Sequence, residues 1–151
     1  MPGPSPTPAL IALLAEHARP VMEAIGVTAA AVSWWDRERG TLRTLVNVGA
    51  LHPSESAFPE DECYPLDAFP AIAALLRFGR PYIDPPDVSS SAVLAALRHR
   101  SQGAVPIVCE GEVWGELWAA SGERSLEPQD LPALSACADR IGRMLVAQPG
   151  R

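Results

Sequence analysis

Several features that mark whole classes of protein are missing from this sequence. The cysteines, Cys63, Cys109 and Cys137, are odd in number and widely spaced, which excludes a disulfide scaffold and gives no pair the spacing of metal ligands. Basic residues are scattered through a chain of net charge −6, so no basic face is available to bind nucleic acid. The longest uncharged apolar run, residues 24–35, is shorter than the roughly 20 residues of a membrane-spanning helix.

Targeting and catalytic patterns are missing as well. The first residues alternate proline with small residues and lack the basic and apolar regions of a signal peptide. Together with free thiols, this predicts a cytoplasmic protein with no membrane or nucleic-acid partner. No Ser-His-Asp order, phosphate loop, metal-ligand cluster or supported pair of acids stands out, so we expect a non-enzyme with no catalytic residues and no metal site.

What is present fits one globular domain. The chain has 151 residues, of which 48% are hydrophobic and 20% charged, and a single domain of that size buries enough surface to be stable alone. We expect a flexible proline-rich leader over residues 1–7, the domain over 8–147 and a short tail over 148–151.

Apolar residues at steps of three and four predict a helix near each end of the chain. Gly26 is placed to end the first helix, which Pro20 should kink or break. Pro128 is placed to begin the last helix. The narrow apolar stripes predict a helical seam between two copies of the chain. Its candidate residues are Leu10, Leu14, His17, Val21, Leu131, Leu134, Ala138, Ile141 and Leu145.

Strand patterns fill much of the rest. Residues 29–36 and 41–48 predict one hairpin, and residues 102–109 and 112–120 predict a second with a two-residue turn at Glu110 and Gly111. Between them, residues 67–78 predict a helix capped by Asp67 and ended by Gly79. A short strand at 81–84 and a short helix beginning at residue 91 follow. This order predicts an α+β fold with a mainly antiparallel sheet.

The sequence from about residue 10 to residue 146 resembles the GAF domain, a relative of the PAS domain. Val105-Pro106-Ile107 on one strand and Gly111-Glu112-Val113-Trp114-Gly115 on the next carry most of the resemblance. The segments 31–40, 64–70 and 75–81 also resemble those of bacterial signalling GAF domains. The resemblance implies terminal helices on one face of the sheet and a central segment on the other.

The resemblance also implies a function. We expect a non-catalytic sensory domain that binds an unidentified small molecule, pairs as a homodimer and signals to an output domain or partner. The cofactor is unknown. Aromatic residues facing the central helix would line the pocket, together with Cys109. The candidates are Trp34, Tyr64, Phe69, Tyr82, Cys109 and Trp118.

Alternatives remain open at this point. The chain could be a dimerisation module whose cavity is filled by its own tryptophans. It could also resemble the free methionine sulfoxide reductases, with Cys63 and Cys109 as the reacting thiols. A haem would need an axial histidine, of which His99 is the best placed. Neither the cyclic-nucleotide motif nor the bilin-binding cysteine-histidine pair of GAF domains is matched at Asn47 or Cys63.

Overall fold

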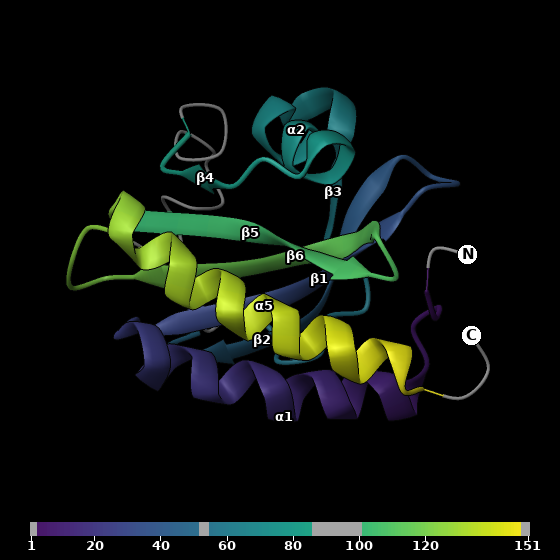
Figure 1. Ribbon diagram of the computed structural model, residues 1–151, viewed down its shortest axis with the longest axis horizontal. Coiled ribbons are helices and arrows are strands. Elements are labelled where there is room, and N and C mark those ends of the chain that lie inside the picture. Colours follow the sequence, from purple (N-terminus) through teal and green to yellow (C-terminus); the bar gives the residue numbers. More distant parts are fainter. Residues whose placement is uncertain (1–2, 52–54, 86–100, 149–151) are drawn as a thin grey trace.

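The computed structural model describes residues 3–51, 55–85 and 101–148. Within them, a six-stranded antiparallel sheet in the order β3-β2-β1-β6-β5-β4 forms the middle layer (Figure 1). Its strands are β1 (Ala29–Asp36), β2 (Thr41–Gly49), β3 (Cys63–Pro65), β4 (Tyr82–Ile83), β5 (Ser101–Cys109) and β6 (Glu112–Ser121). The helices α1 (Pro8–Ile25) and α5 (Leu131–Val146) cover one face, and α2 (Pro70–Phe78) lies over the other. The predicted α+β architecture is confirmed.

The two hairpins form as predicted. Glu110 and Gly111 both have positive φ, 52° and 81°, which makes the two-residue turn between β5 and β6. The first hairpin contains a bulge between Val32 and Ser33, so Leu45 on β2 has no direct partner on β1. The short edge strand β3 was not predicted, because three residues are too few to show an alternating pattern.

Successive residues of a strand point to opposite faces, so the sheet separates two cores. On β6, Leu117 belongs to the core beneath α1 and α5, whereas its neighbours Glu116 and Trp118 lie toward α2. We call these sides the terminal-helix face and the α2 face. The terminal-helix core is mainly aliphatic, and the α2 core contains most of the partly buried aromatic rings.

Helix α1 begins and ends at residues suited to those positions. The Thr7 hydroxyl accepts a hydrogen bond from the Leu10 amide, and Gly26 closes the helix in the left-handed conformation at φ 75°. The helix continues through Pro20, so the structure shows no break at this residue. The buried neighbours Ala18 and Val21 belong to the core beneath α1, so both sides of Pro20 are anchored.

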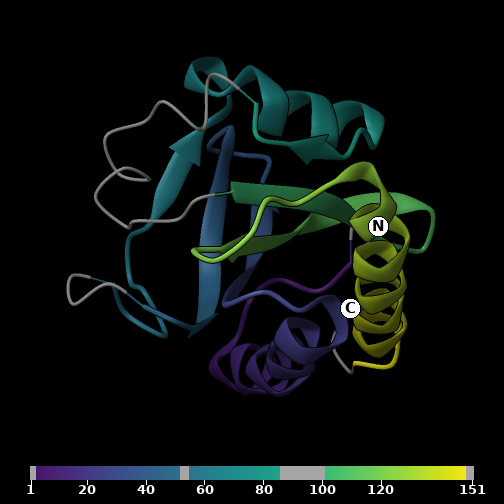
Figure 2. The same cartoon turned by 90° about the vertical axis from the view of Figure 1, so that its left-hand side faces the viewer.

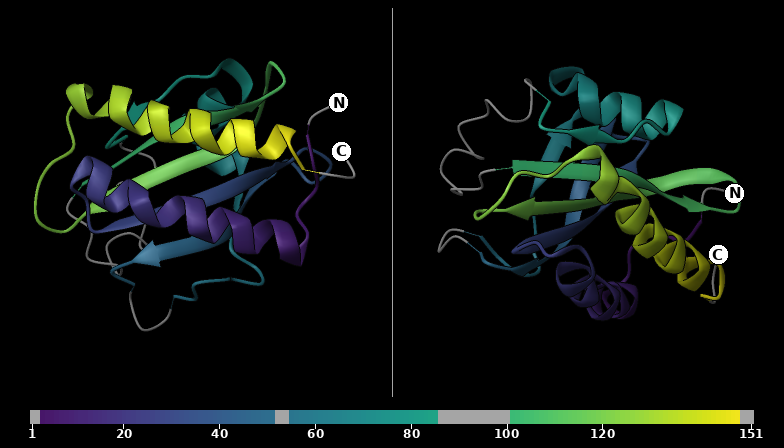
Figure 3. Two further views of the ribbon diagram at one scale, coloured as in Figure 1. Left: turned by 60° about the horizontal axis from the view of Figure 1, so that its bottom comes forward. Right: turned by 60° about the vertical axis from the view of Figure 1, so that its left-hand side comes forward.

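The apolar stripes of α1 and α5 are used inside one chain, which corrects the expected seam between two copies. The helices lie side by side and antiparallel on the sheet (Figure 3). Most of the proposed seam is at most 4% exposed, and only His17 and Leu131 are partly exposed. The buried members are Leu10, Leu14, Val21, Leu134, Ala138, Ile141 and Leu145. A stripe of this width is what one helix needs in order to pack on its own sheet.

Two further predictions need correction. The leader is not free over residues 3–7, because Pro4 is buried and its carbonyl accepts a hydrogen bond of 2.8 Å from Trp114 Nε1. Asp67 does not cap the central helix. It lies in a 3₁₀ turn, Leu66–Ala68, and α2 starts only at Pro70, with Phe69 at the capping position. Gly79 ends α2 as predicted.

Two remaining predictions concern the middle of the chain and the membrane. The short strand expected at 81–84 is β4. The helix expected from residue 91 lies outside the described residues. In the parts of the chain that the structure describes, no helix has both the length and the apolar character needed to cross a membrane.

Candidate functional site

The α2 face of the sheet brings together aromatic and aliphatic residues from all six strands, the 3₁₀ turn and α2. Figure 2 shows α2 lying across the strands on the side opposite α1. Buried residues of this core come from the sheet, the 3₁₀ turn and α2, and aromatic rings pack against them. The rings are Trp35, Tyr64, Phe69, Tyr82 and Trp118. Tyr64 and Phe69 meet edge to face with centroids 5.5 Å apart.

Four of the six predicted pocket residues share this face: Tyr64, Phe69, Tyr82 and Trp118. The other two, Trp34 and Cys109, belong to the terminal-helix core. The position of Trp34 on the terminal-helix face follows from strand alternation, because its neighbour Trp35 lies on the α2 face. Cys109 shares the face of Ile107, two residues away on β5. The sequence alone does not say which of two adjacent tryptophans points toward α2.

A polar cluster lies beside the rings at the β2–β3 edge. The Tyr64 hydroxyl donates a 2.9 Å hydrogen bond to Glu62 Oε2, and Asn47 Nδ2 donates a 3.2 Å bond to Glu62 Oε1. Both carboxylate oxygens of Glu62 therefore have partners. Burial, followed by the nearby charge of Glu62, raises the pKa of Tyr64, so its phenol stays protonated and acts as a donor.

Two more polar pairs are buried along the sheet. Ser33 Oγ donates to Thr44 Oγ1 at 3.2 Å, from β1 to β2. On the other side, Trp118 Nε1 donates to Gln102 Oε1 at 2.7 Å, from β6 to β5. Ser33, Thr44 and Gln102 are each at most 3% exposed. A buried surface that carries so many polar groups is unlike the aliphatic core on the opposite face.

Glu116 is the residue of this face that the sequence did not single out. It lies on β6 opposite Ser33, is 3% exposed, and its Oε1 atom has no hydrogen-bond partner. Tyr82 donates a hydrogen bond to the carboxyl group, but burial outweighs it and raises the pKa of Glu116 to about 7. The available signal was alternation, because Glu116 must share a face with Trp118.

Cys63 lacks the activation of a nucleophilic thiolate. Cys63 is exposed on β3, and burial together with Asp61 raises its pKa. Cys109 and Cys137 are buried. A nucleophilic cysteine needs a lowered pKa, so the geometry gives no support to the reductase alternative.

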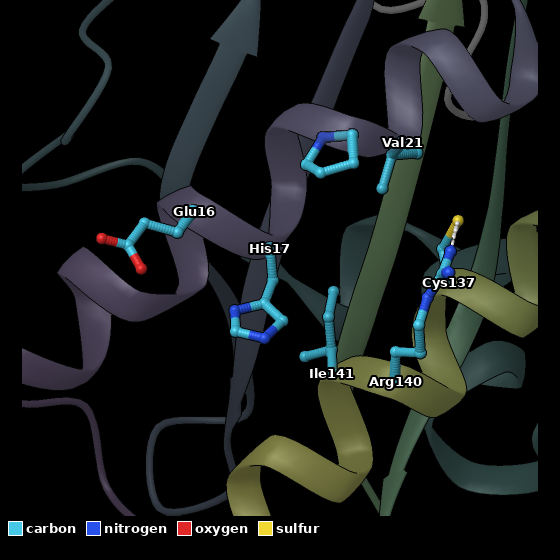
Figure 4. Close-up of a pocket in the computed structure, with 7 residues that line it drawn as sticks. Glu16, His17, Val21, Cys137, Arg140 and Ile141 are labelled. Atoms are coloured by element: carbon cyan, nitrogen blue, oxygen red, sulfur yellow. Dashed lines mark hydrogen bonds between the residues drawn. The ribbon is translucent and has the colours of Figure 1, made fainter.

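A hollow of about 320 Å³ lies between α1 and α5 (Figure 4). Glu16, His17 and Val21 line it from α1, and Cys137, Arg140 and Ile141 from α5. Arg140 Nη2 lies 3.2 Å from Cys137 Sγ, and His17 Nδ1 lies 2.9 Å from the Leu13 carbonyl oxygen. Both contacts stay within single helices.

Metal and haem ligation find no support in the residues described. Among them, no three His, Cys, Asp or Glu side chains gather in a way that could hold a metal ion. His99 lies outside the described residues, and His17 is in the hollow between α1 and α5 rather than on the α2 face.

Comparison with known proteins identifies a protein family with this fold. A family model described as GAF domain matches residues 9–145. No curated protein sequence matches the chain.

Several solved structures are similar. A methyl-accepting chemotaxis protein, residues 122 to 287, is 23% identical with a TM-score of 0.70, covering 91% of this chain and 88% of that one. The GAF domain of PixJ from Thermosynechococcus elongatus, in its blue-light absorbing form, is 17% identical with a TM-score of 0.69, covering 91% and 85%. A GAF domain/HD domain protein from Geobacter sulfurreducens is 15% identical with a TM-score of 0.67, covering 90% and 91%. At these identities the likeness concerns the fold.

Proposed function

The chain belongs to the GAF domain family, and on that premise we propose that it is a sensory regulatory domain that binds a small molecule on the α2 face of its sheet. The observation that carries the proposal is the contrast between the two cores. The α2 core combines aromatic rings with buried polar groups, the composition of a ligand site, whereas the terminal-helix core is mainly aliphatic, with Trp34 and Trp114 as its aromatic members.

Signal output would use the opposite face. Strands β1, β6 and β5 contribute to both cores, so a ligand that moves Glu116 or Trp118 also moves Leu117, which packs under α1 and α5. The terminal helices would pass the change to an output domain or a partner. The chemotaxis protein and the GAF domain/HD domain protein are consistent with such a role.

Pairing of two copies remains part of this proposal in a changed form. Since the apolar stripes are buried within one chain, a homodimer would have to use the exposed sides of α1 and α5. The hollow beside His17 and Arg140 lies on that side.

A thermal-shift screen tests the proposal. The purified chain is screened against a small-molecule library, and each stabilising compound is tested again on two variants. Trp118→Phe alters the α2 face and Trp34→Phe alters the terminal-helix face, with the same change of side chain. We expect stabilisation to fall in Trp118→Phe and to persist in Trp34→Phe. A screen without any stabilising compound, or with the opposite pattern in the variants, would count against ligand sensing at this face.

A further inference from the structure

The most unusual group of the α2 face is the carboxylate of Glu116. It is the one acid of this core whose side chain is 3% exposed while one oxygen, Oε1, is without a hydrogen-bond partner among the residues described. An unpaired polar atom in a buried site costs free energy, and an unpaired charge costs more. Native proteins retain such a group where a further partner completes it.

The neighbouring residues that the structure describes do not supply that partner. Ser33, directly across on β1, uses its hydroxyl on Thr44, and Gln102 Oε1 accepts from Trp118. Tyr82 contributes the one hydrogen bond that the carboxyl group receives from its neighbours. The missing group is therefore a donor that comes from outside this set.

Charge narrows the choice of donor. In the described part of the chain, the ion pairs join Arg39 to Asp36 and Arg124 to Asp130, and neither involves Glu116. A second acid, Glu62, is held nearby by Tyr64 and Asn47, also without a cation. A neutral donor would satisfy Oε1 but leave the buried charge, whereas a cation with an N–H group would satisfy both.

The rings favour the same class of ligand. Tyr64, Phe69, Tyr82 and Trp118 lie on this face, and the faces of aromatic rings attract cations. The protein already shows one such contact at the edge of the core, where the Arg37 guanidinium carbon lies 4.0 Å from the centroid of the Trp35 ring.

We propose that the α2 face recognises a small organic cation carrying N–H donors, an alkylammonium or guanidinium group, which binds the free Oε1 of Glu116 beside the aromatic rings. This inference rests on the proposed function, because it names the ligand class of that same site. Burial raises the pKa of Glu116 to about 7 when no ligand is bound, so above that pH the carboxylate is ionised and ready to pair.

Calorimetric titration of the full chain at pH 8 with three matched probes tests the inference. Butylammonium, 1-butanol and butyrate share a chain length and differ in charge. We expect butylammonium to bind at least tenfold more tightly than 1-butanol, and butyrate to bind most weakly. Glu116→Gln, which keeps the shape and removes the charge, should weaken butylammonium at least tenfold and leave 1-butanol unchanged. Tetramethylammonium, which has no N–H group, should bind more weakly than butylammonium.

Glu112→Gln is the matched control, since Glu112 is an exposed acid on the same strand. It should leave the butylammonium affinity unchanged, which separates pairing at Glu116 from a general effect of net charge.

The inference is overturned if Glu116→Gln binds butylammonium as tightly as the original chain, which would mean that the Glu116 carboxylate does not pair with the ammonium group. It is also overturned if 1-butanol or butyrate matches butylammonium. In those cases, binding that Trp118→Phe weakens would leave the proposed function standing. Failure of all the probes to bind would count against the ligand class, and the library screen would then decide on sensing separately.

Discussion

At the scale of single residues, Glu116 explains most about the α2 face. A carboxylate on the inner side of a strand is rare, because ionising it in a buried place costs free energy. Here the strand places Glu116, which is 3% exposed, between two buried positions, Gly115 and Leu117. Its protonation state therefore becomes coupled to the stability of the whole domain.

We predict that Glu116→Gln stabilises the ligand-free protein at high pH only. The folded pKa, about 7, lies above the unfolded value of 4.5, so the neutral form favours the folded state. The stability of the original chain should fall relative to the variant as the pH rises from 4.5 to 7, by an amount on the order of 3 kcal/mol. Urea unfolding at pH 4.5, 6 and 8 measures this difference. A constant difference at all three values would show that Glu116 is not the titrating group.

At the scale of secondary-structure elements, Arg124 joins the two terminal helices. Its guanidinium donates to the last carbonyls of α1, to Ile25 at 2.7 Å and to Gly26 at 3.1 Å. It also makes a two-point contact with Asp130 before α5, at 3.0 and 3.1 Å. The contact lowers the pKa of Asp130, so this contribution is present at neutral pH and is lost as the pH falls through that lowered pKa.

We predict that Arg124→Lys loosens the end of α1. A lysine cannot make the planar two-point contact and reach both carbonyls at once. Because the Arg124 side chain is 36% exposed, the loss should be modest, about 1 kcal/mol. Hydrogen exchange at the last turn of α1 should become faster. The control Arg143→Lys, at an exposed position of α5, should change neither the stability of the protein nor this exchange rate. Equal exchange rates in both variants would contradict this link between the helices.

The sequence predicted the elements well where local patterns determine them. The hairpin turns, the glycine ends of α1 and α2, and the proline start of the last helical segment follow from the conformational preferences of those residues. It could not identify what each stripe packs against, because a narrow apolar stripe fits a second helix or the chain's own sheet equally well. For the same reason, the sequence could not determine on which face of the sheet Trp34 and Cys109 lie, because that depends on the strand register.

At the scale of the whole molecule, one sheet separates two chemically different cores. The terminal-helix core is mainly aliphatic and ties α1 and α5 to the sheet, so it supplies stability. The α2 core carries the aromatic and buried polar groups. Because the cores lie on opposite faces of the sheet, side chains of the α2 core can be substituted without loss of the packing beneath α1 and α5.

We predict that Leu14→Ala unfolds single chains rather than separating pairs. Leu14 is fully buried in the terminal-helix core, and such a truncation costs about 2 to 5 kcal/mol. The melting temperature should fall by the same amount at low and high protein concentration. The neighbouring Leu13→Ala, at a partly exposed position, should cost less. A drop that shrinks at high concentration would instead indicate that Leu14 lies between two copies.

Tryptophan indole N–H signals can report whether a ligand binds on the α2 face rather than elsewhere on the domain. In a ¹H–¹⁵N spectrum recorded during titration with butylammonium, Trp118 reports on the α2 face, and Trp114, which donates to the Pro4 carbonyl, reports on the terminal-helix face. We expect a saturable shift that is larger for Trp118 than for Trp114 and is lost in Glu116→Gln. A larger shift at Trp114, or unchanged signals from both, would contradict it.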